Sequence, residues 1–319
     1  MALEPQAIPP SLGDEALDEL LVLTPQLARK RRSQLRIIFD RFVRNRLAVA
    51  GFFVLVLIGA AALFAPIIYH QTTTFDPSTY INLKASPAFQ GPSLQHPLGT
   101  DDLGRDILTR ILYGGRVSLL IGISSMFIGI FVGVTIGALA GYFGGVIDNI
   151  LMRVTDIVLA IPLYLLLFVL SATFSDGSIF SMVILIAIFS WTTTARLVRS
   201  EFLALKEREF VMAARTLGAS NFRLMLRHIL PNAAGPIIVA ATLMVGANII
   251  VESILSFFGF GIALPLASWG TMVSQGKSYF LEDPMLVWAP GVCILLVVLS
   301  FNLMGDGLRD ALDPYLTER

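Results

Sequence analysis

The sequence has little charge and few of the residues that build catalytic or metal sites. Only 14% of its 319 residues are charged and 55% are hydrophobic, whereas an ordinary soluble domain carries roughly 25% charged residues. A single cysteine, Cys293, excludes a disulfide framework and a thiolate metal cluster. The three histidines, His70, His96 and His228, are far apart and lack the spacing of metal ligands. This composition predicts an integral membrane protein.

Catalytic motifs are missing as well. The sequence contains neither HExxH nor GxSxG. Its nearest approach to a phosphate loop has five residues between Gly270 and Gly276, where that loop requires four. We therefore expect no enzyme activity, no cofactor and no metal in this chain.

Long apolar runs are abundant, and a spanning helix needs about 20 residues. The first run lies too deep in the chain, and is too long, for a cleaved signal peptide. Six spans are expected, at residues 47–70, 117–142, 150–174, 179–197, 233–258 and 286–304. Pro162 should kink the third. The predicted organisation is a tail with a basic segment (1–46), the first span (47–70), an extracytoplasmic loop (71–116), a core of five spans (117–306) that includes a polar loop (198–232), and a tail (307–319).

Basic residues are concentrated before the first span. Eight lysines and arginines lie between Arg29 and Arg46, and apolar residues are interleaved with them at helical spacing. This pattern is typical of an amphipathic helix on an anionic membrane surface. The alternative, an arm that binds nucleic acid, is disfavoured by the span that follows directly. We expect contact with membrane lipid and none with nucleic acid.

The distribution of lysine and arginine also predicts the orientation. Seventeen lie in the two termini and the polar loop, five lie on the other side, and Arg153 lies at a boundary. Both termini and the polar loop are therefore predicted to be cytoplasmic.

The loop before the second span contains His96 and three aspartates, Asp101, Asp102 and Asp106. A metal site is one interpretation. The favoured interpretation is a short helix capped by Thr100, Asp101 or Asp102.

Two features lie inside the spans. Gly129, Gly133, Gly137 and Gly141 form overlapping GxxxG units, which let another helix approach closely. The same strip also suits a sliding surface, and the sequence leaves both interpretations open.

Glu252 is a carboxylate in an otherwise apolar run, where a buried charge costs much free energy. It is interpreted as a pore-facing acceptor for a peptide's amino terminus or an interhelical contact, or as a hydrated residue near the outer interface.

The polar loop has helix-forming composition. A helix is predicted over 197–217, with Gly218 as its C-cap. Ser220 or Asn221 should cap a second helix that ends at Pro231. The expected apolar stripe consists of Phe202, Leu205, Phe210, Ala213, Ala214 and Leu217, with the two alanines facing outward near the bend. By composition alone, a docking surface and a solvated loop without a partner are alternatives.

The stretch from Glu209 to Pro231 resembles the EAA loop of ABC-importer permeases. The matching positions are Ala213, Ala214, Gly218, Leu230 and Pro231. Two positions depart from that pattern, because Met212 replaces the name-giving glutamate and His228 replaces a usual isoleucine.

Four other segments resemble the C-type permease subunits of peptide importers. They are GTDDLGRD (99–106), AGYFGG with a following aspartate (140–148), LMRVTD (151–156) and FNLMGDGLRDALDP (301–314). With the loop they are collinear with that family from about residue 35 to the end. SWTTTARLVR, RHILPN, ESILSFFGFG and SWGTMVSQG are closer to the oligopeptide type than to the dipeptide type.

The resemblance implies an all-α, MetI-like permease of a type I ABC importer in the bacterial inner membrane. It implies a second homologous permease subunit, two ATPase subunits that bind ATP and Mg, and an extracytoplasmic solute-binding protein. In this family the loop docks on the ATPase, which assigns Ala213, Ala214 and Gly218 to the contact. Oligopeptides are the expected substrate, with dipeptides, nickel chelates or another small solute as alternatives. The alternative from another functional class is a passive channel or a secondary transporter, neither of which needs an ATPase.

Overall fold

The computed structural model describes residues 34–68, 88–264 and 266–312. Within these ranges five helices are long and apolar enough to cross a membrane, and a bent helix pair makes a sixth span if it is counted as one. The same ranges contain no β-strand beyond an isolated bridge between Thr100 and Asp106. The predicted all-helical class is confirmed.

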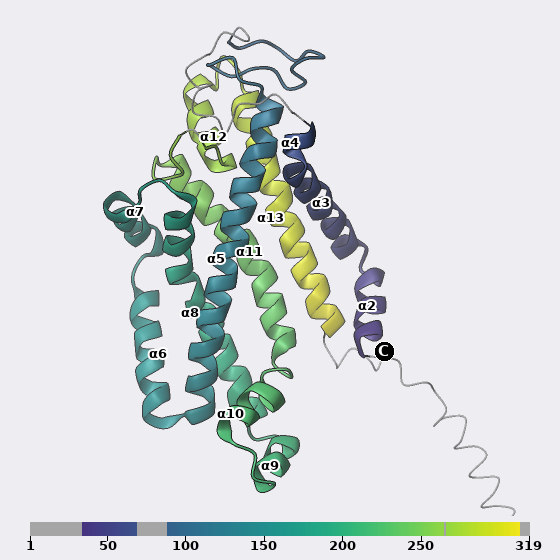
Figure 1. Ribbon diagram of the computed structural model, residues 1–319, viewed down its shortest axis with the longest axis vertical. Helices are drawn as coiled ribbons and strands as arrows, with labels where there is room; N and C mark the ends of the chain where they lie inside the picture. Colours follow the sequence, from purple (N-terminus) through teal and green to yellow (C-terminus); the bar gives the residue numbers. More distant parts are fainter. Residues whose placement is uncertain (1–33, 69–87, 265, 313–319) are drawn as a thin grey trace, which may run out of the picture.

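The helices follow the expected spans with different bounds. In chain order they are α2 (Gln34–Arg44), α3 (Arg46–Leu63), α4 (Ala65–Ile68), α5 (Ile107–Phe143), α6 (Gly145–Ala160), α7 (Leu163–Phe174), α8 (Ile179–Leu205), α9 (Glu209–Thr216), α10 (Asn221–Arg223) with a π-helical continuation (Leu224–Ile229), α11 (Ala234–Phe257), α12 (Trp269–Gly276), a 3₁₀ turn (Lys277–Tyr279) and α13 (Met285–Leu312). Figure 1 shows α5 along the bundle, with α3 and α13 on one side and α6 to α8 on the other. The short helices α9 and α10 project at one end, and α12 lies at the opposite end.

The second span is longer than predicted. Instead of a short helix followed by a span from residue 117, α5 is one helix of 37 residues that begins at Ile107. Its N-cap is Asp106, whose carboxylate accepts a 2.7 Å hydrogen bond from the amide of Thr109. The predicted caps, Thr100, Asp101 and Asp102, lie before this start, so that prediction is corrected.

The third span is broken rather than kinked. α6 and α7 meet at Ile161 and Pro162 with a bend of 85°. Proline lacks an amide hydrogen and disfavours helical geometry in the residue before it, so both residues leave the helix. The prediction placed the break correctly and underestimated its angle.

All four glycines of the predicted packing strip face α8. A Cβ atom on Gly133 would lie 2.7 Å from the carbonyl oxygen of Trp191, and one on Gly141 would lie 2.7 Å from that of Arg199. Gly129 meets the Ser190 side chain, and Gly137 meets the Ala195 carbonyl more closely still. Because backbone atoms cannot move aside, this geometry favours the close-packing interpretation over the sliding one.

Replacing Gly137 with alanine should therefore destabilise the protein. We expect a loss of about 1–3 kcal/mol, as for overpacking in a close-packed interior, seen as a lower Tm of the purified protein in detergent. The control is Gly291→Ala in α13, where an added Cβ meets nothing within 4 Å. Equal Tm values for the two variants would contradict the packing argument.

Candidate functional site

The polar loop folds as two short helices joined by a tight turn. α8 ends at Leu205, and α9 begins only at Glu209. The predicted continuous helix over 197–217 is therefore wrong, because the chain changes direction at residues 206–208. The turn after α9 matches the prediction, since Gly218 has a φ of +83°. The amides of Gly218 and Ala219 bond to the carbonyls of Arg215 and Ala214, which is the Schellman pattern.

The second helix has the start that the sequence indicates. Ser220 is its N-cap, and the hydroxyl accepts from the amide of Arg223. The side chain of Asn221, the alternative cap, instead accepts a 2.7 Å hydrogen bond from the hydroxyl of Tyr142 in α5. The helix widens into a π turn and ends before Pro231, which has no amide hydrogen to continue the hydrogen-bond ladder.

A buried apolar cluster fixes this hairpin to the long helices. Val211, Leu224 and Ile229 have no exposed surface, and they pack with Phe202 of α8 and Tyr142 of α5. The loop is therefore an extension of the membrane bundle. A force applied to the hairpin acts directly on α5 and α8.

The site residues expected in the loop divide into two groups. Glu209, Ala213, Gly218 and Pro231 are exposed, whereas Ala214 and Leu230 are partly buried against the cluster that fixes the hairpin. The expectation that both alanines face outward is therefore corrected for Ala214. An added Cβ at Gly218 meets nothing within 4 Å, so the glycine is needed for its backbone conformation.

The most exposed part of the hairpin is apolar, which the sequence interpretation missed. Leu217 is 89% exposed and Phe222 is 72% exposed. The apolar tip consists of Phe210, Met212, Leu217, Phe222 and Leu226. Exposed arginines accompany it at positions 215, 223 and 227. The predicted stripe grouped Phe210 and Leu217 with Phe202, which is buried, because it assumed one continuous helix. The break before Glu209 turns Val211 inward instead. Several large apolar side chains exposed on one short hairpin, together with charged ones, indicate an interaction site.

Glu252 lies in the last turns of α11, away from the polar loop that precedes this helix, and is completely buried. Its carboxylate accepts hydrogen bonds from three hydroxyls, those of Ser268 at 2.6 Å, Ser256 at 2.7 Å and Ser118 at 3.3 Å. Ser118 belongs to α5, and Ser268 is the N-cap of α12. Among the described residues no lysine or arginine pairs with Glu252. This burial favours the interhelical contact and argues against the pore-facing and hydrated interpretations.

The contacts of Trp269 strengthen the same junction. Its amide donates to the hydroxyl of Ser118, and its indole donates at 3.0 Å to the carbonyl of Ile111. Glu252 therefore joins α5, α11 and α12 through three hydroxyl groups.

The aspartates before α5 make ion pairs instead of a ligand set. Asp101 pairs with Arg105 and with the buried Arg110, both at 2.6 Å. Arg110 also donates to the side chain of Gln275 in α12. His96 lies 3.1 Å from Asp106. In the part of the chain that the structure describes, no group of three or more His, Cys, Asp or Glu residues could hold a metal ion.

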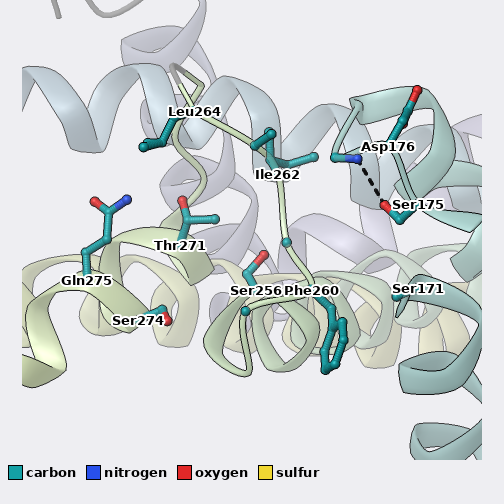
Figure 2. A pocket seen from close by; sticks show the side chains of 14 residues that line it. Ser171, Ser175, Asp176, Ser256, Phe260, Ile262, Leu264, Thr271, Ser274 and Gln275 are labelled. Atoms are coloured by element: carbon teal, nitrogen blue, oxygen red, sulfur yellow. Dashed lines mark hydrogen bonds between the residues drawn. The ribbon is translucent and has the colours of Figure 1, made fainter. Parts of the chain in front are cut away.

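A polar cleft opens beside α12, as Figure 2 shows. Its volume is about 430 Å³, and the α7–α8 turn, the loop after α11 and α12 itself form its walls. The amide of Ala263 bonds to the carbonyl of Gly177 and ties the two loops together. Hydrogen bonds from Ser178 lower the pKa of Asp176 to about 2, so this exposed carboxylate is ionised at neutral pH. The cleft therefore presents hydroxyls and one negative charge at the end opposite the loop.

Removing the acceptor at Glu252 should weaken the junction of α5, α11 and α12. We expect Glu252→Leu to lower the Tm strongly, because each buried hydroxyl left without a partner costs about 1–3 kcal/mol. Glu252→Gln keeps an acceptor oxygen and should cost less. The control is Glu282→Leu at an exposed carboxylate. If Glu252→Leu and Glu282→Leu melt at the same temperature, Glu252 does not stabilise the junction.

Two models of known protein families together match most of the chain. A family model described as "Binding-protein-dependent transport system inner membrane component" matches residues 133–318. A second, described as "N-terminal TM domain of oligopeptide transport permease C", matches residues 33–92.

Similar curated proteins carry related names. The oligopeptide transport system permease protein OppC of Bacillus subtilis and the dipeptide transport system permease protein DppC of Alkalihalophilus pseudofirmus are each 40% identical. The glutathione transport system permease protein GsiD of Shigella flexneri is 43% identical. Each match spans 86% of this chain and 88% of the relative.

A solved structure of the MetNI methionine ABC transporter in an inward-facing conformation has a similar fold. Its TM-score is 0.52 at 20% identity, over 64% of this chain and 96% of that chain. The predicted MetI-like permease fold is therefore confirmed. The chain belongs to the family of binding-protein-dependent transport system inner membrane components and, within it, to the ABC peptide permeases.

Proposed function

We propose that this permease imports peptides and that its polar loop docks on a partner ATPase. The family consists of permease subunits, and ATP hydrolysis belongs to separate subunits. The observation that carries the proposal is the exposed apolar tip with its arginines, held rigidly on α5 and α8. Apolar anchors within a polar rim are the usual composition of an energetically important contact.

The proposed docking contact differs from the one based on motif positions alone. Ala213 and Gly218 are exposed beside Met212 and Leu217, so small and large side chains together form the surface. Ala214 supports this surface from beneath, and Glu209 lies in the first turn of α9. Leu230 and Pro231 close the hairpin against the bundle. Met212 adds apolar area where the family pattern has a charge.

The loop is proposed to face the cytoplasm, together with both termini. The termini and the loop together contain 17 lysines and arginines, and the segments on the other side contain five. Such an excess is the usual bias of cytoplasmic segments. In Figure 1, α2 and the last turns of α13 lie toward the end of the bundle that carries the loop. This arrangement supports residues 1–46 and 307–319 as cytoplasmic tails and residues 71–116 as the extracytoplasmic loop, in an inner membrane.

The proposed importer contains further subunits. They are a second homologous permease, two ATPases that bind ATP and Mg, and an extracytoplasmic solute-binding protein. ATP-driven closure of the ATPases would move the hairpin, and the long helices would transmit that movement to the outer end. The cleft beside α12 is suited to meet the delivered solute or its carrier, because it lies at that outer end.

Peptides are proposed as the substrate class. The relatives are named for oligopeptides, dipeptides and glutathione, which share the amide-linked backbone of a peptide. We therefore expect ATP-driven uptake of short peptides by the complete importer, purified through a tag on this chain and placed in liposomes with its binding protein. Uptake that continues without ATP would instead support a passive channel or secondary transporter.

A charge placed on the apolar tip should release the ATPase. We expect Leu217→Asp to reduce the recovered ATPase roughly thirtyfold, equivalent to the loss of about 2 kcal/mol at a contact hot spot. Leu217 is exposed, so the fold should tolerate the change. The matched control is Leu281→Asp, since Leu281 is 96% exposed on the opposite side of the membrane bundle. Wild-type recovery of the ATPase with Leu217→Asp would refute docking at this surface.

A further inference from the structure

The helix α6 has very little buried surface. Only one of its 16 residues, Thr155, is buried, and the hydroxyl of this residue bonds to its own helix at Leu151. Four apolar side chains of α6 are 48–73% exposed, namely those of Val146, Ile150, Val154 and Ile157. In Figure 1, α6 stands at the edge of the bundle, beyond α8. Burial therefore contributes little to holding α6 in its position.

Both ends of α6 are joints. Gly144 and Gly145, which connect it to α5, have φ values of +66° and +54°, a conformation that glycine adopts without strain. A Cβ atom on Gly145 would meet nothing within 4 Å, so no neighbouring atom blocks a change of angle there. At the other end Ile161 and Pro162 form the 85° bend to α7. Short segments at the ends of helices are the places where a hinge absorbs a change of angle.

Two ion pairs join α6 to α8 between these joints. The guanidinium of Arg199 donates to both carboxylate oxygens of Asp148, through Nε at 2.5 Å and Nη2 at 2.6 Å. Arg196 donates one hydrogen bond of 2.5 Å to Asp156, and both of these side chains are about half exposed. The two aspartates lie eight residues apart on α6, which is about 12 Å along a helix. Two ties at that separation fix the direction of α6, whereas a single tie would leave a pivot.

The pair of Asp148 and Arg199 is the stronger tie. Exposed ion pairs contribute little unless their geometry is bidentate, and this pair is bidentate, with Asp148 only 13% exposed. Two parallel N–H···O bonds also fix the relative orientation of the two groups. The backbone of Arg199 lies against α5, because a Cβ atom on Gly141 would lie 2.7 Å from its carbonyl oxygen. Arg199 thus joins α5, α6 and α8.

This junction is one helical turn from the cluster that fixes the hairpin. Phe202, three residues after Arg199, packs in that cluster with Val211 and Leu224 of the hairpin. A displacement of the hairpin is therefore passed to α8 through buried packing and, at Arg199, to α6 through an ion pair. Beyond Asp156 a cavity of about 660 Å³ lies between α8 and the α6–α7 break, so packing against α8 does not replace the ion pairs there.

We propose that the ion pair between Asp148 and Arg199 transmits the movement of the hairpin to α6, so that α6 turns on its two joints together with α8. The inference rests on the proposed docking of the hairpin on an ATPase. Asp148 and Arg199 are then positioning residues for import, because they act on the moving helices. Without the ion pair, α8 still follows the ATPase and α6 lags behind it, so ATP is hydrolysed with less import.

Distances between spin labels test this transmission directly. The only native cysteine is Cys293, so a Cys293→Ser background accepts labels at chosen sites. Leu57→Cys on α3 carries the reference label, and the second label is on Val146→Cys at the start of α6 or on Ala204→Cys at the end of α8. All three side chains are exposed. The complete importer, with cysteines removed from its other subunits, is measured in liposomes with and without a non-hydrolysable ATP analogue.

We expect the analogue to change both distances in the importer that keeps Asp148. With Asp148→Asn, the distance to position 204 should change as before, and the change at position 146 should fall by at least half. A full change at position 146 in Asp148→Asn would overturn the inference and leave the proposed function standing. If neither distance changes in the importer that keeps Asp148, the result counts against both.

Import per ATP hydrolysed separates transmission from folding. Asp148→Asn should lower this ratio about fivefold, the size of a lost coupling interaction, while ATPase recovery stays at the wild-type level. Asp148→Glu keeps the charge and should restore most of the ratio. Arg199→Lys keeps the charge but loses the bidentate geometry, so its ratio should be intermediate.

The control is Glu282→Gln, which removes an exposed carboxylate outside the junction and should leave the ratio unchanged. Equal ratios for Asp148→Asn and this control would exclude the ion pair as the transmitting contact. A lower Tm of Asp148→Asn with an unchanged ratio would show that the ion pair only stabilises the bundle.

Discussion

The close contact between α5 and α8 is the constraint on which the rest of the structure depends. Glycine at four successive i+4 positions removes every side chain that would separate the two backbones. α8 then lies directly against α5, with Trp191, Thr194 and Ala195 facing the glycines. The hairpin cluster is built across one end of the same two helices, because Tyr142 and Phe202 both belong to it. The position of the loop is thus set by backbone contact inside the membrane.

The two ends of the bundle use different chemistry for the same purpose. At one end α12 is held by the buried hydrogen bond from Ser268 to Glu252 and by the hydrogen bond from Arg110 to Gln275. At the loop end apolar packing holds the hairpin, and its tip remains exposed. A polar junction constrains geometry through directional bonds, whereas an exposed apolar surface gains free energy only when a partner covers it. The difference is consistent with a structural role at the α12 end and supports the docking role that we propose for the hairpin.

Much of this organisation follows from the sequence. Apolar runs located the spans, Pro162 located the break and Gly218 located the turn, since each depends on local chemistry. The remainder depended on contacts between distant segments. Asp106 caps α5 although three neighbouring residues are equally good caps, and Phe210 faces outward because the chain bends at residues 206–208. Glu252 could not be placed from sequence, since Ser118 and Ser268, which satisfy it, lie 134 and 16 residues away.

The unbroken length of α8 has a mechanical consequence. Its 27 residues span about 40 Å, from the turn at Ser178 to the start of the hairpin. A rigid rod of that length works as a lever: a tilt of about 5° about one end displaces the other by roughly 3.5 Å, about two-thirds of the radius of a helix with its side chains. Two short helices in series would lose that displacement at their joint. Neighbouring α6 and α7 have such a joint at their bend. A single rocking movement of the hairpin would therefore tilt α8 as one body, while the angle between α6 and α7 changes.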